Sequence, residues 1–152
     1  MEAVVTSVVA VVGTLLGAVV AGVLQHRLTR QERIAAQDSE LRRERLAAVT
    51  NLVAAIAEHR RAMWARENLR LNGADSAVYE HARTASHTTR AAVTAPLTAV
   101  QILAPALAEH AETAARTTFS LRNAATEDIL AARRAAAIEA ADRLVHAAVT
   151  AI

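Results

Sequence analysis

The hydrophobic and polar positions divide the chain into an apolar first segment and a long amphipathic remainder. Ala3–Leu24 contains no charged side chain and is built almost entirely from Val, Leu, Ala and Gly. At 1.5 Å per residue, a helix of about 22 residues spans about 33 Å, which is enough to cross the hydrocarbon core of a membrane. The pattern therefore predicts a transmembrane helix over 3–24.

Two other structures compete with a membrane helix here. A secretory signal peptide begins with basic residues and has a shorter apolar stretch, whereas only Met1 and Glu2 precede this run. A helix in the core of a small domain is seldom apolar on every face. A membrane anchor is the interpretation that we favour.

The next stretch, 25–45, is mostly Arg, Glu, Gln and Asp, a composition typical of a solvated helical stalk. No Gly or Pro occurs between Val23 and Asn72. Because these are the residues that most often break helices, we expect the membrane helix to continue outward as one long helix.

From residue 46 onward, apolar positions recur at spacings of three and four, which predicts helices packed in an antiparallel bundle. The first seam contains Leu46, Val49, Val53, Ile56, Arg60, Met63, Glu67 and Arg70. Arg60 and Glu67 can lie inside it only if they are paired with other groups. Asn72-Gly73 is predicted to end this helix, because both residues tolerate a left-handed turn.

Three further helices follow in the pattern. Asp75 or Ser76 is expected to cap the second helix, which contains Pro96. Pro105 is expected to start the third helix, which covers Ala106–Ala124. Thr126 precedes the fourth helix, Ile129–Ile152. The predicted inward residues are Val78, Ala82, Ala85, Thr89, Ala92, Pro96, Val100 and Leu103 in the second, Leu107, Ala111, Ala114, Thr118 and Leu121 in the third, and Leu130, Ile138, Ala141, Val145 and Ile152 in the fourth.

The predicted fold class is therefore all-α. It consists of a transmembrane helix (3–24), a charged stalk (25–45) and an Ala-rich antiparallel bundle of three to four helices (46–152). Composition supports this, because about a quarter of the residues are alanine, the best helix former, and aromatics make up only 2%. Alanine buries little apolar surface, so we also expect the chain to form homo-oligomers.

The charge pattern predicts an orientation. All 17 basic side chains are arginine, and Arg27, Arg30 and Arg33 directly follow the apolar segment. An excess of Arg beside a membrane helix stays on the cytoplasmic side. We therefore expect the N-terminus outside the cell (inner) membrane, the bundle in the cytoplasm, and these three arginines on lipid head groups.

Gly13, Gly17 and Ala21 place small residues on one face of the apolar segment. Such a G-x-x-x-G face lets two membrane helices pack closely, so it is a candidate dimer face. The alternative is a chance match, since Gly and Ala are common in membrane helices.

No catalytic, cofactor-binding or metal-binding residues are predicted. The chain has no cysteine, and its Glu-His dipeptides, such as Glu58-His59, point about 100° apart on a helix and cannot share a metal. The Ser86-His87 pair lies in a predicted helix, without the sharp turn of a catalytic nucleophile, so we expect its hydroxyl groups to bond to helix carbonyls or a partner helix. No phosphate-binding glycine loop is present. We expect no enzyme activity, no cofactor and no small-molecule substrate, and nucleic-acid binding is disfavoured by the net charge of only +2.

Several short motifs are similar to a known family. They are Arg42-Arg43-Glu44-Arg45-Leu46-Ala47-Ala48-Val49, His59-Arg60-Arg61-Ala62-Met63-Trp64, Ser86-His87-Thr88-Thr89-Arg90, Ala95-Pro96-Leu97, Leu121-Arg122 and Ala141-Asp142-Arg143-Leu144. Together they resemble small actinobacterial proteins called KilB, named for a Streptomyces conjugative-plasmid locus linked to plasmid spread in the mycelium. The resemblance implies a setting in plasmid transfer or spread and brings no catalytic residues.

The hypothesis is a non-enzymatic, single-pass membrane protein whose cytoplasmic bundle binds an unknown protein partner. One alternative is a membrane-active protein of the toxic Kil type. Another is a membrane-tethered nucleic-acid binder, for which strongly salt-dependent binding would be the signature.

Overall fold

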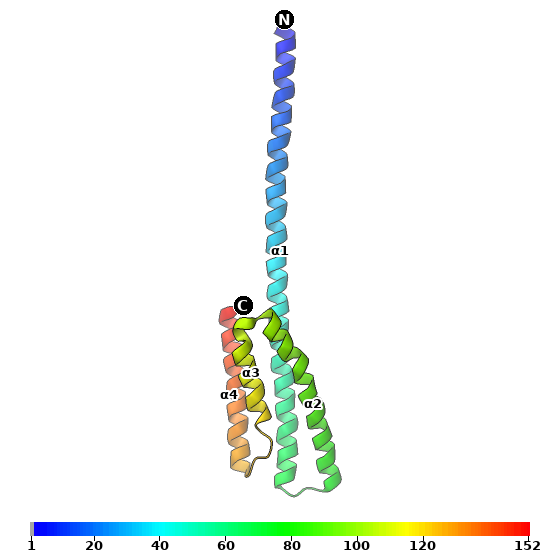
Figure 1. The fold of residues 1–152 in the computed structure, drawn as a ribbon, viewed down its shortest axis with the longest axis vertical. Coiled ribbons are helices and arrows are strands. Elements are labelled where there is room, and N and C mark those ends of the chain that lie inside the picture. The colour runs from blue at the N-terminus through cyan, green and yellow to red at the C-terminus, as the bar shows by residue number, and fades with distance from the viewer. Residues whose placement is uncertain (1) are drawn as a thin grey trace. The chain divides into compact units, whose positions relative to one another are not determined.

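The computed structural model describes the backbone of residues 2–152 and the side chains of residue 33 and residues 36–152. The described backbone forms α1 (Glu2–Leu71), α2 (Ser76–Leu103), the short 3-10 helix η1 (Pro105–Leu107), α3 (Ala108–Phe119) and α4 (Glu127–Ala151) (Figure 1). It contains no strand, which confirms the all-α prediction. The chain divides into two compact units, Met1–Glu40 and Leu41–Ile152, which are described separately.

The first unit is the N-terminal part of α1, which is helical from Glu2 onward. The side chains of the predicted membrane segment, Ala3–Leu24, lie outside the described residues. Among the residues that the structure does describe, no helix is both long and apolar enough to cross a membrane. As expected from the lack of Gly and Pro after Val23, α1 reaches Leu71 without a break.

The exit from α1 follows the sequence prediction. The amide of Ala74 donates to the carbonyl of Leu69 at 3.0 Å, and the amide of Gly73 donates to that of Arg70 at 3.3 Å. With Gly73 at φ +64°, this is a Schellman ending, in which a left-handed residue satisfies the last free carbonyls of the helix. Asp75 then caps α2 by accepting a hydrogen bond from the Ala77 amide at 2.8 Å.

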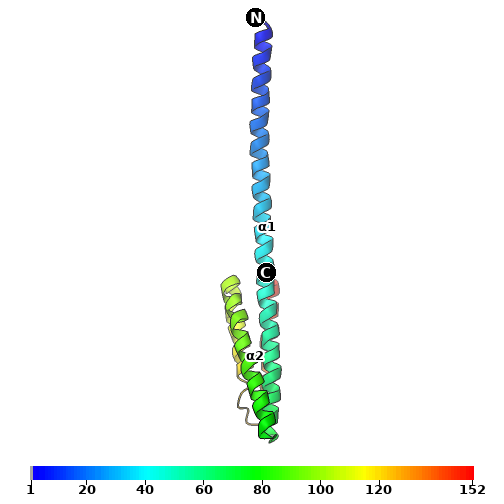
Figure 2. The same ribbon diagram turned by 90° about the vertical axis from the view of Figure 1, so that its right-hand side faces the viewer.

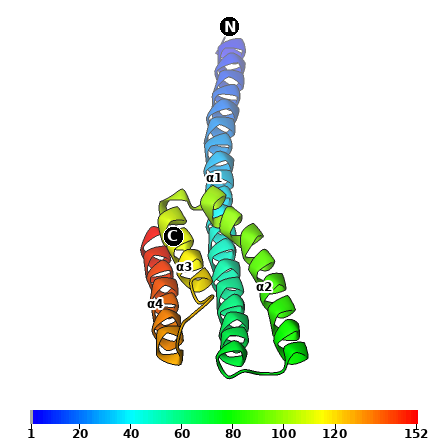
Figure 3. The same cartoon turned by 60° about the horizontal axis from the view of Figure 1, so that its bottom comes forward.

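In the second unit, the 41–71 part of α1 and the helices α2, α3 and α4 run in alternating directions (Figures 1 and 3). The view in Figure 2 shows α2 beside this part of α1. Pro105 stands at the start of η1, as predicted, and Thr126 caps α4 by accepting a hydrogen bond from the Ile129 amide at 3.2 Å. The predicted antiparallel bundle is present.

Two clusters of buried side chains hold the bundle together. The large cluster contains Ala48, Val49, Leu52, Ile56, Val93, Val100, Ala104, Leu107, Ala111, Ala114, Ala115, Ala140, Leu144 and Ala148. The small cluster contains Met63, Leu121, Ala124, Leu130 and Ala137. Many of these residues are alanine, so the helices contact one another through short side chains.

The inward face of the third predicted helix is correct at every position, from Leu107 to Leu121. The predicted faces of α2 and α4 are wrong by about one position over part of their length. In α2, Ser86 and Val93 are buried where Ala85 and Ala92 were expected, and Val78 is exposed. In α1, Leu46 is also exposed, while Leu52, which lies outside the predicted seam, is fully buried.

In α4, Ile138 and Val145 are exposed, and the buried residues are Ala137, Ala140, Leu144 and Ala148 beside the expected Leu130 and Ala141. The physical reason is close approach of the helices. Alanine fills the space between closely packed backbones, and the bulkier Ile138 and Val145 turn toward solvent.

Candidate functional site

Polar side chains are buried along the part of α1 that follows residue 58. His59 is almost fully buried, Arg66 is 6% exposed and Glu67 is 0% exposed, and Ser86 on α2 is buried beside them. Burying a charged group costs free energy unless it is paired and hydrogen-bonded. These residues are therefore the first place to look for a role beyond packing.

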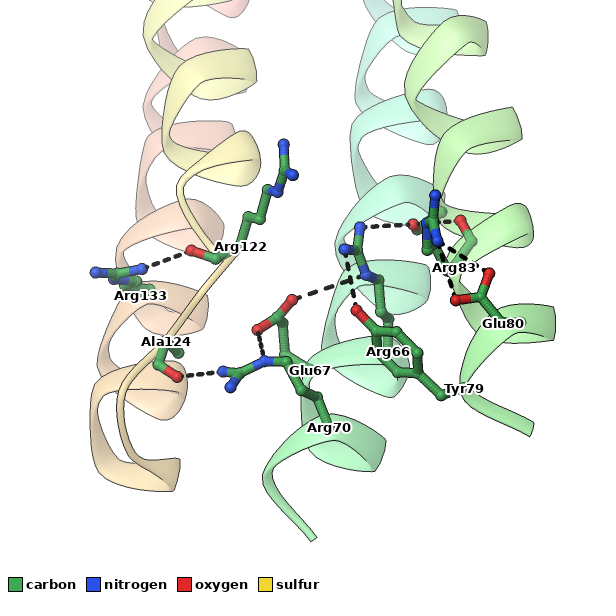
Figure 4. Close-up of polar contacts among 10 residues, drawn as sticks. Arg66, Glu67, Arg70, Tyr79, Glu80, Arg83, Arg122, Ala124 and Arg133 are labelled. Carbon is green, nitrogen blue, oxygen red and sulfur yellow. Dashed lines mark hydrogen bonds and ion pairs between the residues drawn. The ribbon is translucent and has the colours of Figure 1, made fainter. Parts of the chain in front are cut away.

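Glu67 is held between two arginines of its own helix (Figure 4). Its Oε2 accepts a hydrogen bond from Arg70 Nε at 2.9 Å, and its Oε1 lies 3.9 Å from Arg66 Nε. Arg70 also donates through Nη2 to the carbonyl of Ala124, in the segment between α3 and α4. The prediction that Glu67 must be paired inside the seam is confirmed.

Arg66 reaches from α1 to α2 but is incompletely bonded. Its Nη1 lies 3.3 Å from Ser86 Oγ and its Nη2 lies 3.3 Å from the Tyr79 hydroxyl, so both hydrogen bonds are long. Its Nε has no hydrogen-bond partner among the described residues. The guanidinium group thus retains capacity to donate to another acceptor.

His59 connects α1 with α2 and α3. Its Nδ1 lies 3.0 Å from Thr89 Oγ1, and its ring meets that of Phe119 edge-on at 5.4 Å between centroids. The Thr89 hydroxyl also lies within hydrogen-bond distance of two carbonyls on its own helix, so its one proton points there and His59 Nδ1–H donates to it. Burial, and then the positive charge of Arg90, lower the pKa of His59 from 6.5 to about 4, so the ring is neutral at pH 7.

A cleft of about 320 Å³ opens beside these residues, where α1, α2 and the end of α3 meet. It is lined by His59, Met63, Arg66, Ser86, His87, Arg90, Phe119 and Arg122. The guanidinium of Arg90 lies 3.7 Å from the centroid of the Phe119 ring, on its face. Three arginines thus line one small space, and no carboxylate of the described residues lies among the lining groups. We call it the basic cleft.

The hydroxyl groups near the basic cleft are not arranged for nucleophilic catalysis. Ser86 Oγ donates to the Arg83 carbonyl at 2.7 Å, inside α2, as the sequence pattern predicted. The neutral His59 is bonded to Thr89 rather than to Ser86. Among the described residues, no group of three His, Asp or Glu side chains could hold a metal ion.

A second hollow is apolar and lies between α1 and the C-terminal end of α4. It measures about 420 Å³ and is lined by Arg42, Leu46, Val49, Thr50, Val53, Val145, Ala148, Val149 and Ile152. Leu46, Val145 and Val149 are among the most exposed large apolar side chains of the described chain. Arg42 is the charged residue of this lining. We call it the apolar groove.

The site residues predicted from the sequence all belong to α1. The structure does not describe the surroundings of five of these residues, which are Gly13, Gly17, Ala21, Arg27 and Arg30. The sixth, Arg33, is exposed. The structure therefore leaves the predicted dimer face and lipid contacts as predictions.

Sequence reasoning missed the basic cleft, because its members come from three helices and one connection. The sequence marks Arg90 and Arg122 only as residues of two separate family motifs. A usable signal was the Glu67 position in the apolar seam, since a buried acid requires nearby arginines. The pairing of Arg134 with the Trp64 ring, 4.8 Å from its centroid, was also unforeseen.

The fold and its two hollows define a class: a small all-α bundle, rich in alanine and arginine. The family model described as KilB plasmid transfer protein matches residues 46–152. A curated relative, Protein KilB of Streptomyces lividans, is 52% identical over 144 residues, which cover 95% of each chain. The chain therefore belongs to the KilB family, as its motifs indicated. No solved structure matches it.

Proposed function

We propose that this chain is a non-enzymatic, single-pass membrane protein whose bundle lies in the cytoplasm and binds a protein partner during plasmid transfer or spread. The setting comes from the family description, which names plasmid transfer. The anchor and orientation rest on the uncharged Ala3–Leu24 and on the arginines that follow it.

The observation that carries partner binding is the apolar groove. Val149 is 80% exposed and Leu46 is 58% exposed, on two helices that border the same hollow. Leaving these side chains in water is unfavourable, whereas an amphipathic helix could cover them with its own apolar face. Arg42 at this lining favours a carboxylate on the incoming helix. The proposed occupant is therefore an amphipathic, acidic helix of a partner protein.

A photo-crosslinking amino acid at position 149 tests this proposal in living cells. We expect a discrete covalent adduct of the full chain with one protein, and mass spectrometry of the adduct should place the crosslink in an amphipathic helix. Ile102 is the matched control position, because it is also a large apolar side chain, 70% exposed, and lies on α2 outside the groove.

A second change makes the result specific. L46E adds a negative charge to the groove and should abolish the adduct formed from position 149. I102E should leave that adduct unchanged. Equal crosslinking from positions 149 and 102, or an adduct with a second copy of this chain, would contradict the proposed occupant.

The absence of native cysteine makes the orientation directly testable. Single cysteines at Glu2 and at Ser76, an exposed residue at the start of α2, can be treated with a membrane-impermeant thiol reagent in whole cells. We expect labelling at position 2 and not at position 76 until the membrane is permeabilised. The opposite pattern would place the bundle outside the cytoplasm.

We further propose that Gly13, Gly17 and Ala21 pair two copies in the membrane, while Arg27, Arg30 and Arg33 contact anionic head groups. A G17I substitution places a bulky side chain on the face that must be close-packed. It should abolish energy transfer between labelled copies in vesicles, whereas V20I, elsewhere on the same segment, should preserve it. Unchanged transfer in G17I would exclude this face.

A further inference from the structure

The basic cleft collects positive charge that the protein does not neutralise. Glu67 contacts both Arg66 and Arg70, but its single negative charge can balance only one of them. The contact to Arg70 is the shorter, at 2.9 Å against 3.9 Å for Arg66. Arg90 and Arg122 form no ion pair with a carboxylate among the described residues. Three guanidinium groups around one small space repel one another, and attraction to an anion between them would offset that repulsion.

The most buried of these arginines has unused hydrogen-bonding capacity. Arg66 is 6% exposed, its two hydrogen bonds are both 3.3 Å long, and its Nε has no hydrogen-bond partner within the described chain. Its Nε faces Glu67 Oε1 at 3.9 Å, and each of its two Nη groups uses one of its two N–H groups in these long bonds. A phosphate oxygen that enters the cleft would accept the Nη hydrogens that remain.

The other lining groups suit the same kind of ligand. Arg90 Cζ lies over the Phe119 ring, 3.7 Å from its centroid, and this contact restricts the guanidinium group and lowers the entropy lost on binding. Ser86 and His87 add polar atoms. Arg122 belongs to the segment between α3 and α4 and Arg66 to α1, so these lining arginines come from different elements (Figure 4).

We propose that the basic cleft binds the phosphate group of a small molecule. Guanidinium groups form paired, charge-assisted hydrogen bonds to phosphate oxygens, and several arginines can share its charge. A volume of about 320 Å³ is at the lower end of small-molecule sites, so it admits a phosphate or a small phosphate ester rather than a nucleic-acid duplex. This inference does not depend on the proposed partner helix, because the apolar groove shares no lining residue with the cleft.

Titration calorimetry with inorganic phosphate tests the proposal on the full chain in neutral-detergent micelles, with ionic strength held constant by sodium chloride. We expect saturable binding with one site per chain. R122Q removes an exposed arginine and should weaken binding about tenfold or more, the usual effect of losing one hydrogen bond to a charged group. R122K should recover part of the loss, because it restores the charge without the guanidinium fork.

The matched control is R116Q, which removes an exposed arginine of α3 that does not line the cleft. It should bind phosphate as the unmodified chain does, and circular dichroism should show all variants equally folded. Absence of saturable binding in the folded chain would overturn the proposal. So would an equal loss in R116Q and R122Q, which would indicate only general charge attraction.

Two further experiments distinguish a soluble phosphate ester from a lipid head group as the source of the phosphate. Glycerol 3-phosphate binding to the chain in phosphatidylcholine nanodiscs, with the same R122Q loss, would assign a soluble ester. Loss of that binding when phosphatidic acid is added to the nanodiscs would assign a lipid head group at the same cleft. Binding of a DNA oligonucleotide in preference to both, with R122Q and R116Q equally weakened, would contradict a small-molecule site.

Discussion

The large and small clusters pack against the same helix, α1, but they differ in what lies beside them. The large cluster buries only apolar side chains, and two of its members, Val49 and Ala148, line the apolar groove. The small cluster has five buried residues, and Arg70 ties its Ala124 to the buried charge of Glu67. Both ends thus have an arginine bonded to a backbone carbonyl, since Arg45 Nε donates to the Leu103 carbonyl at 2.8 Å beside the large cluster, but only the end with the small cluster contains a buried carboxylate.

This difference explains how one alanine-rich bundle can have both an apolar groove and a basic cleft. Alanine leaves little apolar area to bury, so bulky side chains such as Val149 remain available on the outside of the large cluster. Near the small cluster, Glu67 contacts Arg66 and Arg70, and Arg66 also lines the basic cleft together with Arg90 and Arg122. The two proposals, for a helix and for a phosphate, therefore rest on opposite ends of one fold.

The largest expected effect tests whether charge supports the small cluster. E67Q removes the negative charge between Arg66 and Arg70, and we expect it to lower the free energy of unfolding by about 4 kcal/mol, because a buried positive charge loses its partner. Urea unfolding can be followed by the fluorescence of Trp64, the single tryptophan, which packs against this cluster.

E58Q is the matched control for that experiment. Glu58 lies on the same helix and pairs with Arg61, but both side chains are more than half exposed, so we expect a change below about 1 kcal/mol. A small effect for E67Q would mean that the charge of Glu67 is dispensable and that the two clusters are held alike.

The next effect concerns the large cluster. L52A truncates a fully buried side chain, and we expect it to cost about 3 kcal/mol through lost transfer energy and the cavity left behind. Far-UV circular dichroism during urea unfolding measures it. The control is L46A on the same helix. The Leu46 side chain is 58% exposed, so its truncation should change the free energy of unfolding by less than about 0.5 kcal/mol. Similar losses in both variants would argue against the cluster as described.

A smaller effect depends on pH. Because the pKa of His59 is lowered from 6.5 to about 4, the unfolded chain takes up a proton at a higher pH than the folded chain does. The stability from neutral His59 is fully present above pH 6.5 and is lost as the pH falls toward 4. Between pH 7.5 and pH 5 this amounts to about 2 kcal/mol. The H59Q variant should lack this part of the pH dependence, and an unchanged slope would contradict the prediction.

The smallest effect concerns the turn between α1 and α2. Gly73 has φ +64°, and a Cβ added at this residue would meet no atom within 4 Å, so G73A should cost only the conformational strain, about 1 kcal/mol. Asn tolerates this conformation better, so thermal unfolding of G73N should lie between that of G73A and the unmodified chain. A larger loss for G73N than for G73A would point to a contact at this turn.

Much of the fold could be predicted from the sequence where signals were local. Asn72-Gly73, Asp75, Pro105 and Thr126 mark the ends of helices through their own backbone preferences, and each occupies the expected place. The faces of α2 and α4 depended instead on neighbouring helices. In a run of alanines every face is equally apolar, so the larger Ile138 was predicted to face the core. The buried residue is its neighbour Ala137.

The candidate sites were less predictable for the same reason. No pattern within α1 marks Arg66 or His59 as buried, and only the packing of α2 and α3 against α1 buries them. The basic cleft needs residues more than fifty positions apart, such as Arg66 and Arg122. No spacing rule within one helix could have joined them, because tertiary packing alone brings them together.

The bond from Arg70 to the Ala124 carbonyl also bears on how the bundle assembles in time. It joins residues 54 positions apart, and it occupies a carbonyl in the connection between α3 and α4. Closing so long a loop costs chain entropy that neighbouring helices do not incur, so contacts of this range are slow to form. The α3–α4 hairpin can therefore associate early, while its connection acquires its final bonds only when α1 docks. Docking of α1 against this hairpin is thus expected to be the late step of folding.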